Sequence, residues 1–393
     1  MFVVKNIAIL GSTGSIGTST LDICQRYPDR YHVIALAAGK NVATALEQCR
    51  QWRPAVISMA DEPSADALTQ QLKSEGITGI EVVHGTAGTV RVATHPDVTF
   101  VVSAIVGVAG LEATYAAVAL GREIGLANKE AMVAAGELII AKARETGATI
   151  LPIDSEHNAI HQCMRGGTPA EVKQIWLTAS GGPFRNTPLA DFAGITPQQA
   201  LKHPTWVMGQ RITIDSATML NKGLEIIEAC RLFNLPADRV RVTIHPQSTI
   251  HSLVEYVDGS ILAQLSVTDM RLPILYAMAY PERVASDLTF DLATLSHLDF
   301  QQPDLARFPC LRLAYEAARA GGTHCIALNA ADEVAVDAFL RGELPFLGIP
   351  ETIERVLAAT PVRTPASIAE VLAADEAARH LAREFLPQPA HAA

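Results

Sequence analysis

The 393-residue chain lacks several features that mark whole classes of protein. Its six cysteines are scattered and form no CxxC pair, which argues against a disulfide framework and against a cysteine-ligated zinc site. Acidic residues outnumber basic ones, and the net charge of −10 supplies no basic patch for a nucleic-acid backbone. No apolar run approaches the length of a membrane span. We therefore expect neither nucleic acid nor a membrane as a partner.

The composition that remains is that of a soluble globular protein. Hydrophobic residues make up 49% of the chain and charged residues 18%, and 393 residues suffice for two or three domains. The first apolar run begins close to Met1, which leaves no room for a signal or transit peptide. Together with the unpaired cysteines, this predicts a cytoplasmic bacterial protein.

A glycine-rich motif follows the first apolar run. Residues Ile7–Leu10 have the pattern of a strand, GSTGSIG follows at Gly11–Gly17, and a helical pattern begins after it. This order is typical of dinucleotide binding, where the glycines let the backbone approach a pyrophosphate at the helix N-terminus. The spacing is GxxGxxG and not the commoner GxGxxG, so the motif needs support from its surroundings.

The end of the next predicted strand lacks an acidic residue. A cofactor with a free ribose 2′-hydroxyl usually meets an Asp or Glu there, but Val33–Ala38 ends in Gly39-Lys40-Asn41. A cation and an amide favour a 2′-phosphate, so we predict NADP(H) as the cofactor. The alternative is that Lys40 merely lies at the start of a helix.

Two further elements carry clustered polar side chains. Asp154-Ser155-Glu156 places two carboxylates on a short turn, and Asn221 and Glu225 share one helix face beside Lys222. Carboxylate oxygens suit a hard divalent cation, whereas Lys, Asn and hydroxyl groups at a helix start suit a phosphate. Jointly they predict a pocket for a phosphorylated small molecule held against a metal. Either element alone would also fit an ordinary turn or a solvated helix face.

The periodicity predicts an α/β fold with three structured regions. Residues 1–153 alternate strands and helices, which predicts a Rossmann-like, doubly wound parallel sheet that binds NADPH. Residues 154–280 predict a central α+β catalytic domain, 281–308 a linker, and 309–393 a C-terminal helical bundle. The strands expected in the first region are Ile7–Leu10, Val33–Ala38, Ala55–Met59, Glu81–Val83, Phe100–Ile105, Glu123–Leu126 and Ile150–Ile153.

The central region should contain a mixed sheet, a helix over Met219–Phe233 and a lid. The expected strands are Ile175–Ala179, Arg211–Ile214, Val240–Ile244, Ser252–Tyr256 and Ile261–Ser266. The loop Lys202–Gly209 carries Trp206 and Met208 between Pro204 and Gly209, and an apolar loop with such hinges is typical of a lid. The alternative is that Trp206 belongs to the core.

These motifs together resemble the 1-deoxy-D-xylulose 5-phosphate reductoisomerase family. The matching stretches run in order through almost the whole chain: GSTGSIG at 11–17, AAGKNV at 37–42, ANKE at 127–130, DSEHNA at 154–159, TASGGPF at 178–184, HPTWVMG at 203–209, DSATMLNKGLEIIEA at 215–229 and IHPQSTIHSLVEY at 244–256. The resemblance implies NADPH, a divalent metal (Mg²⁺, Mn²⁺ or Co²⁺) and a homodimer. It also implies rearrangement and reduction of a phosphorylated ketose to 2-C-methyl-D-erythritol 4-phosphate, the first committed step of non-mevalonate isoprenoid synthesis.

The resemblance also assigns roles to individual residues. The metal ligands would be Asp154, Glu156 and Glu225, and these three would act in catalysis with Lys129 and His203. The substrate contacts would be Lys129, Ser155, Glu156, Ser180, His203, Trp206, Ser216, Asn221, Lys222 and Glu225, with Ser180, Ser216, Asn221 and Lys222 around the phosphate. The cofactor contacts would be Thr13, Gly14, Ser15, Ile16, Gly39, Lys40, Asn41, Asn128, Glu130 and Gly209. Glu228 is expected to support the ligands or to be an exposed charge, and His251 to be a neutral core histidine.

Two other functions fit part of the pattern. A semialdehyde dehydrogenase type of NADP-dependent oxidoreductase would need an activated cysteine nucleophile, for which Cys163 is the candidate. A non-catalytic NADP(H)-binding sensor would leave the three carboxylates and the loop around Trp206 without a role.

Overall fold

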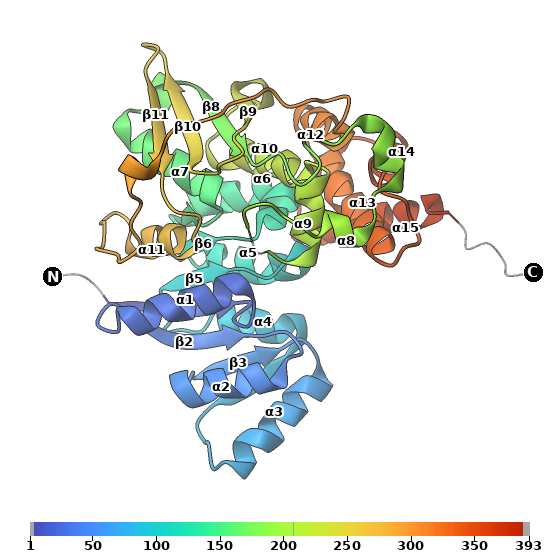
Figure 1. The fold of residues 1–393 in the computed structure, drawn as a ribbon. Helices are drawn as coiled ribbons and strands as arrows, with labels where there is room; N and C mark the ends of the chain where they lie inside the picture. Colours follow the sequence, from blue (N-terminus) through green and yellow to red (C-terminus); the bar gives the residue numbers. More distant parts are fainter. Residues whose placement is uncertain (1–3, 207, 388–393) are drawn as a thin grey trace, which may run out of the picture. The chain divides into compact units, whose positions relative to one another are not determined.

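The computed structural model describes residues 4–206 and 208–387, and the chain divides into two compact units (Figure 1). The first unit consists of the residues up to Ala131, Ile139–Asn158 and Asp269–Leu288. The second consists of Met132–Leu138, Ala159–Thr268 and the residues from Thr289 onward. Each unit has its own sheet and its own hydrophobic core.

The first unit is built on a seven-stranded sheet in which every neighbouring pair of strands is parallel. Its order is β4-β3-β2-β1-β5-β6-β7, so the direction of winding reverses between β1 and β5. The strands are β1 Lys5–Leu10, β2 Tyr31–Ala37, β3 Val56–Met59, β4 Glu81–His84, β5 Phe100–Ser103, β6 Glu123–Leu126 and β7 Thr149–Pro152. The predicted doubly wound parallel sheet is confirmed. Ligands of such sheets bind at the carboxyl ends of the strands, near the reversal.

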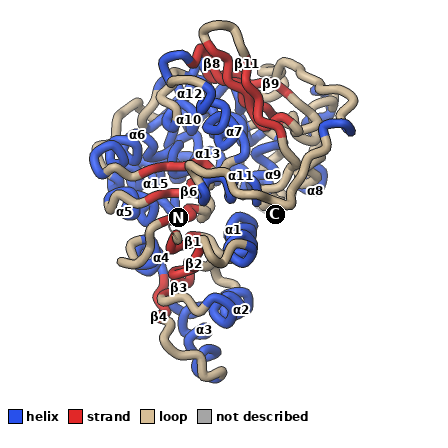
Figure 2. Tube along the Cα trace, turned by 90° about the vertical axis from the view of Figure 1, so that its left-hand side faces the viewer, coloured by secondary structure: helices blue, strands red, loops and turns tan. Residues whose placement is uncertain are grey.

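Helices cover both faces of this sheet. Figure 2 shows α1, α2 and α3 on one side of the strands and α4 and α5 on the other. The helices of this unit are α1 Ser15–Arg26, α2 Val42–Trp52, α3 Glu62–Ser74, α4 Gly85–Ala93, α5 Leu111–Ala119 and α11 Arg271–Ala279. Because both faces are covered, the central strand β1 has a continuous apolar run, and all of Ile7–Leu10 is buried.

Two helices take part in both units. They are α6 Lys129–Thr146 and α7 Ser155–Cys163. In α6 the backbone leaves the helical conformation at Ala135 (φ −129°, ψ 16°), within the stretch that belongs to the second unit. Lys129 and Asp154 lie at or just before the starts of these helices, so helix starts position both candidate site residues.

The second unit contains a four-stranded mixed sheet in the order β11-β10-β8-β9. Strands β8 and β9 are parallel and the other pairs antiparallel, so the predicted mixed sheet is confirmed. The strands are β8 Val172–Ala179, β9 Val240–Ile244, β10 Ile250–Tyr256 and β11 Ile261–Leu265. The prediction of a strand at Arg211–Ile214 is wrong, because these residues lie in helix α9, Gln210–Ala217. The alternation of Ile212, Thr213 and Ile214 has strand propensity, but contacts of Arg211 with another helix override it.

The predicted helical C-terminal region is confirmed by α12 Pro309–Ala320, α13 Thr323–Leu340, α14 Gly348–Ala359 and α15 Ile368–Phe385. The central region contains the helices α8 Pro197–Ala200 and α10 Leu220–Leu232. Short 3₁₀ helices occur at Gly107–Gly110, Met164–Gly166, Pro169–Glu171, Leu189–Gly194, Ala237–Arg239 and Leu292–Thr294. Within the described ranges, no helix is both long enough and apolar enough to cross a membrane.

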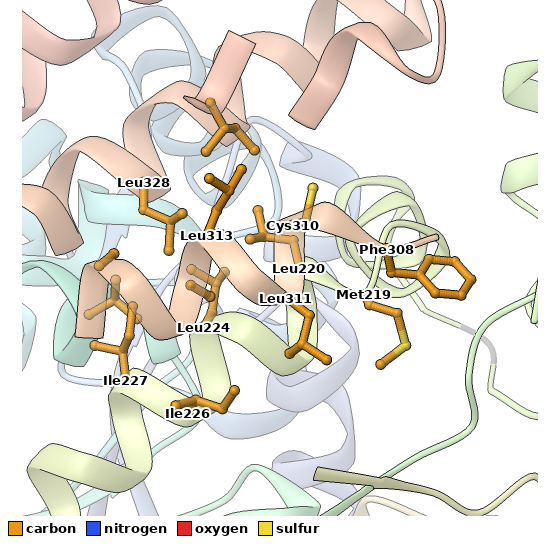
Figure 3. Packing of buried hydrophobic residues seen from close by; sticks show 14 of the residues in the cluster. Met219, Leu220, Leu224, Ile226, Ile227, Phe308, Cys310, Leu311, Leu313 and Leu328 are labelled. Carbon is orange, nitrogen blue, oxygen red and sulfur yellow. The ribbon is translucent and has the colours of Figure 1, made fainter. Parts of the chain in front are cut away.

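Helix α10 packs into the core of the second unit. Figure 3 shows Leu220 and Leu224 of α10 packed among Leu313 of α12 and Leu328 of α13, all of them buried. Burying one side chain of this size stabilises the fold by about 1.5–3 kcal/mol. This apolar face holds α10 in place, while Asn221, Lys222 and Glu225 stand on the same helix.

Candidate functional site

The three glycines of the N-terminal motif have different structural roles. Gly11 has φ +92°, and a Cβ there would lie 2.7 Å from the carbonyl oxygen of Ala104. A Cβ on Gly17 would lie 2.3 Å from the carbonyl oxygen of Gly11. Gly14 is not crowded in this way: its nearest contact would be 3.4 Å, and it is the N-cap of α1. Gly11 and Gly17 therefore serve packing, whereas Gly14, at the N-terminus of α1, is not required for packing.

The other predicted cofactor residues of this motif occupy the same turn. Thr13 precedes Gly14, and Ser15 and Ile16 form the first residues of α1. The backbone N–H of Gly14 donates to the carbonyl of Gly11 at 3.0 Å, which closes the turn. Because the first turn of a helix has N–H groups without helical partners, this end carries partial positive charge.

The loop after β2 holds Lys40 beside an acid that comes from the next strand. The Nζ of Lys40 lies 2.9 Å from Oδ2 of Asp61, which follows β3. The N–H of Ala60 donates to the carbonyl of Gly39, and the side chain of Asn41 caps α2. Sequence reasoning missed Asp61 because it examined only the end of β2. Pairing of β2 with β3 in parallel is the signal that places the two loops side by side.

The start of α6 is fixed by Asn128. Its Oδ1 accepts the N–H of Ala131 at 2.9 Å, and its Nδ2 donates to the carbonyls of Ile105 and Gly107. The same amide lies 3.2 Å from Oε2 of Glu130. Asn128 and Glu130 therefore stand at the carboxyl ends of β5 and β6, close to the reversal of the sheet, which is where a dinucleotide is expected.

Lys129 and Asp154 form a buried ion pair within the first unit. The Nζ of Lys129 lies 2.6 Å from Oδ2 of Asp154, and both side chains are nearly shielded from solvent. Next to them, the hydroxyl of Ser155 donates to Oε2 of Glu156. His157 was missed by sequence reasoning: it is fully buried, and its Nδ1 lies 3.9 Å from Oδ2 of Asp154. Its position three residues after Asp154, at a helix start, could have identified it.

In the second unit, Glu225 is fully buried and paired on both carboxylate oxygens. Asn221 donates to Oε1 at 2.7 Å and Lys222 to Oε2 at 2.5 Å. The sequence prediction that these three side chains share a helix face is thus confirmed. Glu228 is also fully buried, so its interpretation as an exposed charge is wrong.

The glycine-rich loop after β8 brings three predicted substrate residues together. The Oγ of Ser180 accepts the N–H of Gly182 at 3.2 Å and lies 3.1 Å from Nε2 of His203. A Cβ on Gly182, whose φ is +67°, would lie 2.6 Å from the carbonyl oxygen of Ser216. Only glycine therefore lets this loop lie against the backbone of Ser216.

The hydrogen bonds of His203 assign its tautomer. Nδ1 accepts the N–H groups of Trp206 at 2.9 Å and of Thr205 at 3.2 Å. In the neutral ring the proton must then be on Nε2, which donates to the hydroxyl oxygen of Ser180. Ser180 also accepts from the N–H of Gly182, so its oxygen has two donors.

The loop from Lys202 to Gly209 has no regular secondary structure where it is described. Trp206 is half-buried, with its ring centroid 6.3 Å from that of His251, so the interpretation of Trp206 as a core residue is wrong. His251 is buried, as expected. Gly209 is the N-cap of α9 and belongs to the second unit, whereas the other predicted cofactor residues belong to the first. Val207 of the predicted lid lies outside the described residues.

Helix α9, which carries Ser216, is anchored by Arg211. The guanidinium donates to Glu333 at 2.8 Å, to Asn329 at 3.0 Å and to Asp332 at 3.3 Å, all on α13. Burial raises the pKa of Asp332 to about 6. Sequence reasoning missed this cluster because its partners are more than a hundred residues apart.

The cysteines do not offer an activated nucleophile. Cys24, Cys49, Cys163, Cys310 and Cys325 are buried, and Cys230 is half-buried. Burial raises the pKa of the Cys24 and Cys230 thiols to about 12 and of the Cys49 and Cys325 thiols to about 11. Those four thiols are unreactive at neutral pH. Cys163, the candidate nucleophile of the semialdehyde dehydrogenase alternative, is buried, which removes support from that alternative.

Three family models match successive parts of the chain. Residues 7–136 match 1-deoxy-D-xylulose 5-phosphate reductoisomerase, residues 150–233 match its C-terminal domain, and residues 265–381 match the DXP reductoisomerase C-terminal domain. The 1-deoxy-D-xylulose 5-phosphate reductoisomerase of Dechloromonas aromatica is 53% identical over 391 residues, covering 98% of each chain. That of Solibacter usitatus is 50% identical, covering 97% of each chain.

Solved structures of the same kind share the fold. The reductoisomerase from Zymomonas mobilis in complex with NADPH is 43% identical, with a TM-score of 0.91 over 98% of this chain and all of the other. A DOX-P reductoisomerase in complex with NADPH, fosmidomycin and magnesium is 42% identical, with a TM-score of 0.92 over 97% of this chain and 98% of the other.

Proposed function

The chain belongs to the 1-deoxy-D-xylulose 5-phosphate reductoisomerase family, and from that premise we propose how its residues carry out the family's reaction. It is an NADPH- and divalent-metal-dependent enzyme that rearranges and reduces 1-deoxy-D-xylulose 5-phosphate to 2-C-methyl-D-erythritol 4-phosphate. This is the first committed step of non-mevalonate isoprenoid synthesis. The observation that carries the assignment is at least 50% identity to named reductoisomerases over nearly the full length of the chain.

The acidic side chains fit a hard divalent cation. Asp154 and Glu225 are shielded carboxylates, and each already has a lysine ammonium beside it, which balances a negative charge that would otherwise be costly to bury. Oxygen donors of this kind suit Mg²⁺, Mn²⁺ or Co²⁺. We assign the metal to Asp154, Glu156 and Glu225. When bound, the cation stabilises negative charge that develops on the substrate oxygens during rearrangement.

Lys129 is assigned to the reacting end of the substrate, with Ser155 and Glu156 as further contacts. Its ammonium is held 2.6 Å from Asp154, so its position is set by a partner that is itself assigned to the metal. A cation held in a shielded site attracts substrate oxygens more strongly than one in open solvent. Lys129 therefore orients the oxygens between which the rearrangement occurs.

The phosphate end is assigned to Ser180, Ser216, Asn221 and Lys222. Lys222 provides positive charge, and Ser180 provides a hydroxyl proton because its oxygen already accepts from Gly182 and His203. On phosphate binding, Lys222 and Asn221 would give up part of their hydrogen bonding to Glu225. Charge-assisted hydrogen bonds of this kind are about twice as strong as neutral ones.

NADPH is assigned to the carboxyl ends of the first sheet. Its pyrophosphate would lie on the N-terminus of α1, at Thr13, Gly14, Ser15 and Ile16. Its 2′-phosphate would lie at Gly39, Lys40 and Asn41, and Asn128, Glu130 and Gly209 complete the set. When bound, NADPH supplies the hydride for the reduction.

Trp206 is assigned to a lid that excludes water from the substrate, with His203 as a donor inside it. His203 connects the two parts of this assignment, because its Nδ1 accepts the Trp206 backbone while its Nε2 donates to Ser180. Movement of the loop would therefore change the contacts of Ser180, which is assigned to the phosphate.

The wider organisation is also a proposal. We assign cofactor binding to residues 1–153, the metal, substrate and lid to 154–280, a linker to 281–308 and a supporting helical bundle to 309–393. We propose that the protein acts as a homodimer in the cytoplasm. Light scattering after size-exclusion chromatography measures the mass of the particle, and a monomer of 42.0 kDa would contradict the dimer.

The activity is tested with 1-deoxy-D-xylulose 5-phosphate, NADPH and Mg²⁺ or Mn²⁺, following loss of NADPH absorbance. Omission of substrate or metal should abolish the loss. Lys40→Glu should weaken NADPH sharply, because the 2′-phosphate would then face a carboxylate. NADPH binding without turnover in any metal would favour the sensor alternative, and full activity in metal-free protein with a chelator would contradict the metal assignment.

A further inference from the structure

Where the 2′-phosphate is expected, at the end of the first sheet, Lys40 is paired with an acid. Lys40 is 76% exposed, and its ammonium is paired at 2.9 Å with the carboxylate of Asp61. Glu62 follows Asp61 in the first turn of α3. The cation expected to select NADPH is therefore already neutralised by an acid from the neighbouring loop.

Asp61 is held firmly in this place. Its Oδ1 accepts the N–H of Ser64 at 3.0 Å as the N-cap of α3, which leaves Oδ2 for Lys40. The loops are themselves joined, because the N–H of Ala60 donates to the carbonyl of Gly39 at 3.2 Å. Hydrogen bonds from Ser64 and Lys40 lower the pKa of Asp61 to about 2, so the group is charged at neutral pH.

We propose that Asp61 is a specificity-determining residue that opposes the 2′-phosphate of NADPH and so limits the preference for NADPH over NADH. The inference rests on the proposed function, since it assumes that the dinucleotide binds with its 2′ position at Lys40. A phosphate that contacts Lys40 would have to displace the Asp61 carboxylate or share the ammonium with it. NADH has no charge at this position and meets no such repulsion.

The size of the effect follows from the charges. If phosphate and Asp61 both contact the Lys40 ammonium, they lie up to about 6 Å apart, and in water-like surroundings a phosphate of about two charges is then repelled by about a factor of ten in affinity. Salt reduces this, because the Debye length is about 10 Å at 0.1 M. We expect removal of the Asp61 charge to tighten NADPH binding by about threefold to tenfold.

Asp61→Asn is the informative variant. Asparagine is as good an N-cap as aspartate, so the start of α3 is retained while the charge is lost. Glu75→Gln is the matched control. It removes one negative charge from the other end of α3, where Glu75 pairs with Arg50, and the helix of 13 residues separates the two sites by about 20 Å.

The experiment measures Kd for NADPH and NADH by fluorescence titration of the wild type and both variants, at 0.05 M and 0.5 M salt. We expect Asp61→Asn to tighten NADPH about threefold to tenfold at low salt and less at high salt, with NADH unchanged within about twofold. Glu75→Gln should change neither. Weaker NADPH binding in Asp61→Asn would show instead that the acid holds Lys40 in its binding position, and would overturn the proposal.

Other outcomes also decide the matter. Equal changes for NADPH and NADH, a gain that does not fall with salt, or the same gain in Glu75→Gln would each overturn the proposal. Failure of the proposed function looks different, because then the wild type would not consume NADPH with 1-deoxy-D-xylulose 5-phosphate and Mg²⁺ or Mn²⁺, whatever its affinities for the two cofactors. Thermal unfolding of the three proteins verifies that the variants are folded.

Discussion

Substitution of single glycines in the N-terminal motif separates a packing role from a binding role. Alanine at Gly17 would place a Cβ 2.3 Å from the carbonyl oxygen of Gly11 and 2.5 Å from Cα of Ser12. These neighbours are backbone atoms that cannot rotate away. Alanine at Gly14 would meet its nearest atom at 3.4 Å, which is ordinary contact.

The expected changes in stability differ in size and in cause. In an uncrowded helix, replacing glycine by alanine would stabilise by about 0.5–1 kcal/mol, but overpacking costs about 1–3 kcal/mol and more when only backbone can yield. We therefore expect Gly17→Ala to lower the free energy of unfolding by about 2 kcal/mol or more. Gly14→Ala, at an N-cap with ordinary dihedrals, should change it by less than about 1 kcal/mol.

For cofactor binding, Gly14→Ala is the more informative of the two variants. The methyl group of Gly14→Ala would stand at the open N-terminus of α1, between the helix N–H groups and the pyrophosphate. Loss of one charge-assisted hydrogen bond there weakens NADPH by at least about tenfold. Urea unfolding and NADPH fluorescence titration measure the two quantities. Wild-type NADPH affinity in Gly14→Ala, or equal destabilisation by both variants, would refute this reading of the motif.

Three further predictions concern the second half of the site and the pH dependence of stability. Glu225→Gln should weaken Mn²⁺ binding at least about tenfold in calorimetric titration while NADPH affinity is retained, and unchanged Mn²⁺ affinity would contradict its assignment as a ligand. Trp206→Ala should lower kcat and raise KM together with little change in melting temperature, since the residue is only half-buried; outright unfolding would contradict the lid. Burial, with a smaller contribution from Arg165, lowers the pKa of His161 to about 4. The neutral ring therefore contributes stability to the fold above pH 6.5. This contribution to the free energy of unfolding is lost as the pH falls toward 4, by about 2 kcal/mol between pH 7 and pH 5. Urea unfolding of His161→Leu should lack that part of the pH dependence.

Much of the molecule follows from local sequence pattern. Parallel strands buried on both faces have continuous apolar runs such as Ile7–Leu10, so the strands of the first sheet were predicted in the correct order along the chain. The grouping of Asn221, Lys222 and Glu225 was likewise predictable, because residues three and four apart on a helix are neighbours. The same local information failed at Arg211–Ile214, where short β-branched runs fit a strand as well as a helix.

What the sequence by itself determined is therefore the strands of the first sheet, the cofactor motif and the residue types available for metal and phosphate. Only the tertiary structure decided which distant groups form ion pairs. These are Asp61 with Lys40, Lys129 with Asp154, and Arg211 with Asp332 and Glu333. It also decided that Gly14 has room for a Cβ, whereas Gly11 and Gly17 do not. The physical reason is that hydrogen bonds and ion pairs depend on distances of about 3 Å between atoms, and such distances between residues far apart in the chain are set by packing and not by local periodicity.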